Sequence, residues 1–174
     1  MIAILADTHR ETGHGLSGAA REAVEGADAL VHAGDFTAPS VYEAFQTATD
    51  RFEAVHGNRD DPELQDRLPS KRVFEVGGVR IVLVHGHEHG ETALSLLGRS
   101  EAADLVVFGH SHRPTIIEGD GVPLLNPGSH TRPRGHRAAH AELDDAGRPE
   151  SVDGAVEARL VATDGSVIDA TRIG

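Results

Sequence analysis

Polar residues that can bind metal ions follow several apolar segments of this chain. The central one is segment 28–36, Asp-Ala-Leu-Val-His-Ala-Gly-Asp-Phe, in which an apolar run ends at Gly34-Asp35. A short buried strand here would deliver the Asp35 carboxylate to the carboxyl edge of a sheet, where open α/β sheets bind ligands. One carboxylate has two oxygens and can contact two cations at once. We therefore expect Asp35 to bridge a pair of metal ions.

Four further segments carry candidate ligands, and each follows a predicted strand. They are Asp7-Thr8-His9, Gly57-Asn58-Arg59-Asp60, His85-Gly86-His87 and Gly109-His110-Ser111-His112. The last is the strongest single signal, because two imidazoles on a tight turn would both need hydrogen-bond partners if they were buried. Taken alone, the other segments could be turns or helix caps. Together they predict one metal site, since the strand ends of one sheet lie side by side.

The elements that must position these residues alternate at first between strand and helix. Apolar runs predict strands at 2–6, 29–32, 52–56 and 104–108, and a hairpin with strands at 72–76 and 79–84. Helical spacing predicts helices at 16–25, 39–47 and 91–99, and a short one beginning at Asp61-Pro62. Later segments predict mostly antiparallel strands at 115–118, 122–125, 138–143, 155–162 and 166–170, with a turn at 119–121 and a polar loop at 144–153. This order predicts two packed sheets with helices outside, in one domain covering 1–174.

Composition narrows the classes of function. The net charge of −12 and the 3% aromatic content argue against binding to a nucleic-acid polymer or an anionic membrane. The chain has no cysteine, so a metal site must use nitrogen and oxygen ligands. Neither a basic leader nor an apolar run of membrane-spanning length is visible, so we expect a cytoplasmic location. Apolar strands near the C-terminus could form the surface of a homodimer.

A competing pattern points to a different ligand. Gly13-His14-Gly15-Leu16-Ser17-Gly18 matches the G-x-G-x-x-G signature of dinucleotide binding by letter. In that motif the first glycine stands in the turn directly after the strand, so that the pyrophosphate meets the helix N-terminus. Here six residues separate Ala6 from Gly13. A nicotinamide site would also leave the later histidines unexplained, so we favour the metal site.

Read in order, the motifs D-x-H, G-D, G-N, H-G and G-H-x-H resemble those of the calcineurin-like metallophosphoesterase superfamily. The resemblance extends from Ile2 to about Pro133. The short chain and the Asn126-Pro127-Gly128-Ser129 stretch are most similar to its small prokaryotic branch, the YfcE-like phosphodiesterases. The resemblance implies a four-layer αββα sandwich of two mixed sheets with helices outside.

The resemblance also implies two divalent metal ions and their ligands. One ion would be held by Asp7, His9, Asp35 and His112, and the other by Asp35, Asn58, His85 and His110. Ligand chemistry does not choose among manganese, iron, zinc, nickel and magnesium, and we expect manganese. A hydroxide that bridges the two ions would attack a small phosphate ester, most simply a diester.

One position departs from the pattern of many superfamily members, which have histidine after the asparagine. Arg59 stands there, and an arginine can stabilise a phosphate but cannot donate a proton as a general acid. We assign catalytic roles to Asn58, Arg59 and His87, and leave open whether His87 or water protonates the leaving group. The alternative to an enzyme is a scaffold like the retromer subunit of this superfamily, in which we would expect some metal positions to be substituted. All seven are present here.

Overall fold

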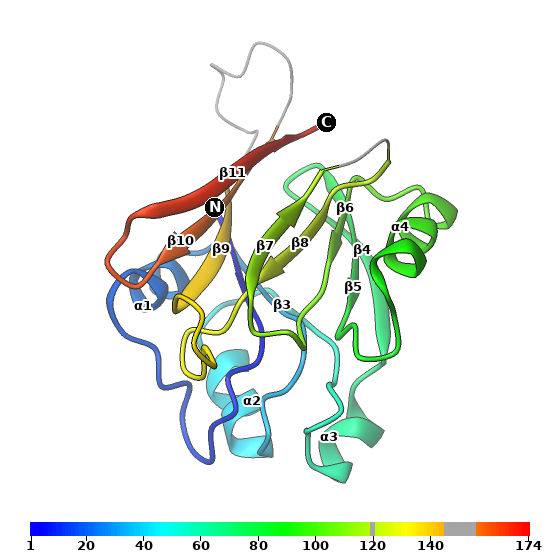
Figure 1. The fold of residues 1–174 in the computed structure, drawn as a ribbon. Coiled ribbons are helices and arrows are strands. Elements are labelled where there is room, and N and C mark those ends of the chain that lie inside the picture. Colours follow the sequence, from blue (N-terminus) through cyan, green and yellow to red (C-terminus); the bar gives the residue numbers. More distant parts are fainter. Residues whose placement is uncertain (119–120, 145–155) are drawn as a thin grey trace.

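The computed structural model describes residues 1–118, 121–144 and 156–174, which form two sheets lying between helices (Figure 1). The first sheet has six strands in the order β11-β10-β9-β1-β2-β3. Their bounds are β1 Ile2–Leu5, β2 Ala29–His32, β3 Phe52–Ala54, β9 Ala139–Asp144, β10 Val156–Ala162 and β11 Val167–Ile173. Strands β1, β2 and β3 are parallel, whereas β9, β10 and β11 pair antiparallel, and β9 is also antiparallel to β1.

The second sheet has five strands in the order β4-β5-β6-β8-β7. Their bounds are β4 Lys71–Val76, β5 Val79–Val84, β6 Leu105–Val107, β7 Pro114–Ile117 and β8 Leu124–Pro127. The three middle strands are parallel, and both outer strands pair antiparallel to their neighbours. The sheet is therefore mixed, like the first one.

Side-chain alternation along the strands creates three hydrophobic layers. In β1, Ile2 and Ile4 pack between the two sheets, whereas Ala3 and Leu5 point to the opposite face, because successive strand residues face opposite sides. The outer face of the six-stranded sheet is covered by α1 Gly18–Glu25, α2 Pro39–Gln46 and α3 Pro62–Arg67. The outer face of the five-stranded sheet is covered by α4 Glu91–Ser100 (Figure 1). This arrangement confirms the predicted four-layer sandwich.

Several predicted boundaries were wrong. The helix expected from residue 16 begins at Gly18, whose φ of +53° lies outside the right-handed helical region. The strand expected at 122–125 is Leu124–Pro127, because Thr115 of β7 pairs with Asn126. The strand expected at 166–170 extends to Ile173, which pairs with Val156. The turn expected at 119–121 and the loop expected at 144–153 lie largely outside the described residues.

Candidate metal centre

The candidate ligands lie on loops that leave the strand ends in an unusual backbone conformation. Asp7, His9, Asp35, His110 and His112 all have positive φ values, between 42° and 68°. Such values cost non-glycine residues of the order of 1–2 kcal/mol each. The loops after β1 and β2 stabilise one another, since the Asp7 amide donates to the Gly34 carbonyl and the His9 amide to the Asp35 carbonyl, both at 3.0 Å. Strain of this kind gathers at functional sites.

Asp7, His9 and His112 form the first group of potential ligands. His112 Nε2 lies 3.5 Å from Asp7 Oδ1 and 3.2 Å from His9 Nε2. The two imidazole rings are stacked with 4.9 Å between their centroids, so their Nε2 atoms point into the same space. One ion could be held between these three side chains.

The second group consists of Asp7, Asp35 and His85. Asp35 Oδ2 lies 3.4 Å from His85 Nε2 and 3.3 Å from His9 Nε2, so the Asp35 carboxylate stands between the two histidine positions. Asn58 Oδ1 is 3.2 Å from His85 Nε2. The structure therefore brings together six of the seven predicted ligands, around two adjacent groups that share Asp7.

His110 is the seventh predicted ligand, and it lies at the margin of these groups. Its exposed ring is 5.4 Å from the His85 ring, measured between centroids. His87, also exposed, has its ring 5.4 Å from that of His85 and 6.2 Å from that of His110. The Arg59 side chain is exposed as well, while its backbone amide donates to Asp35 Oδ1 at 2.8 Å.

Hydrogen bonds at the outer ring nitrogens set the tautomers of two histidines. His85 Nδ1 donates to the Ala33 carbonyl at 2.7 Å, and His112 Nδ1 donates to the Arg132 carbonyl at 2.5 Å. A carbonyl can only accept, so these protons are on Nδ1, and in the neutral form of each ring the Nε2 lone pair can bind a cation. Metal-binding histidines are commonly oriented in this way.

Burial leaves the Asp7 carboxylate without the partners that a charged group needs. Asp7 is 0% exposed, and neither of its carboxylate oxygens has a hydrogen-bond partner among the described residues. Burial raises the pKa of Asp7 to about 7. An unpaired buried carboxylate is costly in an apolar medium, whereas a bound cation would compensate its charge. The orphaned Asp7 oxygens therefore fit a metal site.

Three further ligands have pKa values that suit cation binding. In His85, by contrast, burial alone would lower the pKa, but its hydrogen bond to Asp35 and the charge of that carboxylate outweigh burial and raise it. Burial lowers the pKa of His9 to about 4, and it also lowers the pKa of His112. Both imidazoles are therefore neutral near pH 7, as metal ligands must be. Burial alone would raise the pKa of Asp35, but hydrogen bonding to His85, the charge of His85 and the Arg59 amide outweigh it and lower this pKa to about 2.

Two glycines allow the loops to approach the ligands closely. A Cβ atom at Gly57 would lie 2.1 Å from Asp35 Oδ1. At Gly109 it would lie 3.1 Å from Asp7 Oδ2 and 3.0 Å from the Ala6 Cβ. Gly57 therefore cannot carry a side chain without a shift of the Asp35 carboxylate, whereas Gly109 makes a tight but less severe approach. Both glycines directly precede predicted ligands.

Sequence reasoning missed the residues that hold these loops in place. The Asp60 carboxylate accepts backbone N–H bonds from Asp35 at 3.1 Å, Thr37 at 2.7 Å and Gly57 at 2.7 Å, which ties two ligand loops together. The Ser129 hydroxyl donates to the Asp7 carbonyl at 2.7 Å. Asp60 ends the segment Gly57-Asn58-Arg59-Asp60 and Ser129 ends the stretch Asn126-Pro127-Gly128-Ser129, but neither role can be read from residue type.

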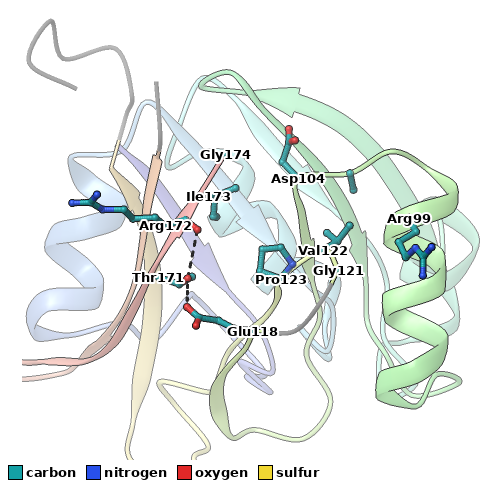
Figure 2. A pocket seen from close by; sticks show the side chains of 11 residues that line it. Arg99, Asp104, Glu118, Gly121, Val122, Pro123, Thr171, Arg172, Ile173 and Gly174 are labelled. Atoms are coloured by element: carbon teal, nitrogen blue, oxygen red, sulfur yellow. Dashed lines mark hydrogen bonds between the residues drawn. The ribbon is translucent and has the colours of Figure 1, made fainter. Parts of the chain in front are cut away.

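A separate crevice lies away from this centre. Its volume is about 670 Å³, and it opens between the end of β11, the β7 and β8 ends and α4 (Figure 2). The Thr171 hydroxyl donates to the Glu118 carboxylate across it. None of the predicted ligands lines this crevice, and its mixed charges from Arg99, Asp104 and Glu118 form no recognisable catalytic set.

Comparison with known proteins identifies the family of the chain. A model of the calcineurin-like phosphoesterase superfamily domain matches residues 1–146. The chain belongs to this superfamily. A probable metallophosphoesterase of Methanothermobacter thermautotrophicus is 35% identical over 138 residues, which cover 77% of this chain and 79% of the relative. A phosphodiesterase of Methanocaldococcus jannaschii is 25% identical over 143 residues, covering 73% and 82%.

Solved structures share the fold at lower sequence identity. YfcE, a phosphoesterase from E. coli, superposes with a TM-score of 0.69 at 22% identity, and the match covers 99% of each chain. Vps29 of Entamoeba histolytica complexed with zinc superposes with a TM-score of 0.72 at 21% identity, covering 98% of this chain and 97% of that one. Every helix in the described ranges is too short or too polar to cross a membrane.

Proposed function

We propose that this protein is a metal-dependent phosphodiesterase that hydrolyses small phosphate esters at a binuclear site, with manganese as the preferred ion. The observation that carries the proposal is the Asp7 carboxylate, which is buried without a hydrogen-bond partner in the described structure and lies beside neutral imidazoles and a second carboxylate. Such a donor set is completed by divalent cations. Membership of the superfamily and the phosphodiesterase among the relatives support the reaction class.

The site residues divide into two ligand sets under this proposal. Asp7, His9, Asp35 and His112 would hold one ion, and Asp35, Asn58, His85 and His110 the other. The position of Asp35, within 3.4 Å of both His9 and His85, supports its role as the bridge. His110 would reach its ion only by a rotation of its exposed side chain toward His85.

The bound ions would activate a water molecule for attack on phosphorus and neutralise charge on the phosphoryl oxygens. The chain supplies the remaining functions. The Asn58 carboxamide orients the ester beside His85, and the permanently charged Arg59 guanidinium stabilises the phosphate. Burial lowers the pKa of His87, so this imidazole is mainly neutral near pH 7 and would donate a proton only from a minor protonated form. Esters with good leaving groups are therefore the best substrates.

The sequence also suggests the size of the substrate and the location of the protein. The proposed substrate is a small molecule, because the net charge of −12 disfavours binding of a polyanionic polymer outside the locally cationic site. The proposed location is the cytoplasm. A homodimer is compatible with this function and is not needed to complete the site.

The direct test is hydrolysis of bis-p-nitrophenyl phosphate by metal-stripped protein, before and after addition of Mn²⁺. We expect turnover only with metal, and a loss of at least about 100-fold in His85→Ala, since that histidine contacts both Asp35 and Asn58. Arg99→Ala, at the distant crevice, is the matched control and should keep full activity. Turnover without metal, or an undiminished His85→Ala variant, would refute the proposal. Mn²⁺ binding without turnover would favour a scaffold.

A further inference from the structure

The loop that follows β8 carries an unusual concentration of positive charge. We call residues 130–137, His-Thr-Arg-Pro-Arg-Gly-His-Arg, the arginine loop. The whole chain has 28 acidic and 16 basic residues, yet no acidic residue occurs between Gly121 and Ala141. A cationic segment in such an acidic protein indicates a specific anionic partner more than general surface charge.

The arginine loop is anchored directly to the metal centre. The Arg132 carbonyl accepts the Nδ1 proton of His112 at 2.5 Å, and the Arg132 amide donates to the Ser129 hydroxyl at 2.9 Å. The Thr131 hydroxyl donates to the Thr8 carbonyl. The Arg132 backbone therefore contacts the candidate ligand His112 directly, and the neighbouring Thr131 contacts Thr8, which precedes the candidate ligand His9.

The charges of Arg132 and Arg134 are available for a ligand. Both side chains are exposed, and within the described ranges neither forms an ion pair. Arg137 of the same loop differs, because its guanidinium contacts the Asp164 carboxylate at 3.4 Å and the Ser166 hydroxyl at 2.5 Å. Arg132 and Arg134 are therefore the two arginines of the loop without an internal partner in the described structure.

The field of these two arginines extends to the candidate ligands. The guanidinium groups of Arg132 and Arg134 are close enough to the first ligand group for their charges to act on His9 and His112. An anion bound beside the first ligand group would therefore experience the two guanidinium charges as well as the metal ions. Arginine forks match phosphate oxygens in a bidentate geometry.

We propose that Arg132 and Arg134 bind a second phosphate of the substrate, so that the substrate class is phosphodiesters carrying an additional phosphomonoester group. This inference rests on the proposed function, because it places the scissile phosphate at the metal centre. Arg59 stands on a different loop and serves the scissile phosphate. The two arginines are thus specificity residues for the second phosphate.

The test compares two substrates with the same leaving group. One is the p-nitrophenyl ester of thymidine 5′-phosphate, and the other is the same compound with an added 3′-phosphate. We expect the wild type to prefer the 3′-phosphorylated substrate through a lower KM, and the Arg132→Ala/Arg134→Ala variant to lose about tenfold of this preference. Arg137→Ala removes the same charge from the same loop at a side chain that is already engaged, and should keep the preference. Raising the ionic strength should weaken the preference, since exposed charges are screened by salt.

Binding of the reaction products separates this inference from the proposed function. Thymidine 3′,5′-bisphosphate should bind the Mn²⁺-loaded wild type about tenfold more tightly than thymidine 5′-phosphate in calorimetry, and the double variant should lose this difference. A binding preference without any turnover would refute the phosphodiesterase and retain the second phosphate site. Turnover of both substrates with no preference, or a preference that survives in the double variant, would overturn the inference.

Discussion

Replacing Asp7 by asparagine should separate the stability of the protein from its metal binding. The variant Asp7→Asn keeps the shape of the side chain but removes its charge. Asparagine also tolerates the φ of +55° that Asp7 adopts. Its amide protons have acceptors nearby in the neutral imidazoles of His9 and His112, whose Nε2 atoms lie 3.9 Å and 3.5 Å from Asp7 Oδ1. We therefore expect the variant to fold.

The size of the expected change in stability follows from the pKa of the buried Asp7 carboxyl. Burial raises the pKa of Asp7 to about 7 from an ordinary value of 3.8. Between these two pH values the folded metal-free chain retains a proton that the unfolded chain has released. Its stability therefore falls as the pH rises through this window. At about 1.4 kcal/mol per pH unit, the cost of Asp7 grows by up to about 3 kcal/mol between about pH 5 and pH 8.

The assay is urea unfolding of both proteins in EDTA at pH 5 and pH 8. We compare the free energy of unfolding of Asp7→Asn with that of the wild type. This difference should shift in favour of the variant by up to about 3 kcal/mol between pH 5 and pH 8, because the other titrating groups are common to both proteins. At 100 times Kd, excess Mn²⁺ should stabilise the wild type by about 2.7 kcal/mol for each occupied site, and it should stabilise the variant less, because the variant lacks a ligand of the first ion. A difference between the two proteins that is the same at both pH values would refute the reasoning, as would Mn²⁺ stabilisation of the variant equal to that of the wild type.

Two further substitutions test the residues around the ligands. Ser129→Ala removes the hydroxyl that donates to the Asp7 carbonyl, and we expect Mn²⁺ affinity measured by calorimetry to fall about 10–100-fold. Unchanged affinity would show that Ser129 does not position Asp7. Gly57→Ala would place a Cβ atom 2.1 Å from Asp35 Oδ1, so we expect about 1–3 kcal/mol of destabilisation in urea together with loss of activity. A fully stable and active Gly57→Ala variant would contradict the tight packing of these loops.

The four-layer fold and the proximity of the candidate metal ligands could be predicted from the sequence, because both depend on hydrophobic patterns within short segments. Buried parallel strands such as β1 and β2 are continuous apolar runs, and the polar residue after each run must emerge at the same sheet edge. The pairing of Ile2 with Ala29 and of Leu5 with His32 then places Asp7 and Asp35 on adjacent loops. The first ligand group follows from this register and from the return of His112 after β6.

The parts that escaped prediction depend on contacts between distant segments. Asp60 bonds three amides on two loops, and no local pattern distinguishes it from the N-cap Asp61 beside it. The position of His110 outside the closest ligand groups arises from the turn at Gly109 and could not be foreseen from the G-H-x-H spacing. β11 ends at Ile173 because it pairs with β10 up to that residue. This end could not be predicted from the sequence, because an exposed edge strand has a weak hydrophobic pattern.

The central claim is that two cations lie side by side between these loops. Crystals soaked in Mn²⁺ and measured at the manganese absorption edge test it most directly. We predict two anomalous peaks about 3.5–4 Å apart, one beside Asp7, His9 and His112 and one beside Asp35 and His85. A single peak, or peaks elsewhere on the molecule with none beside Asp35, would contradict the account.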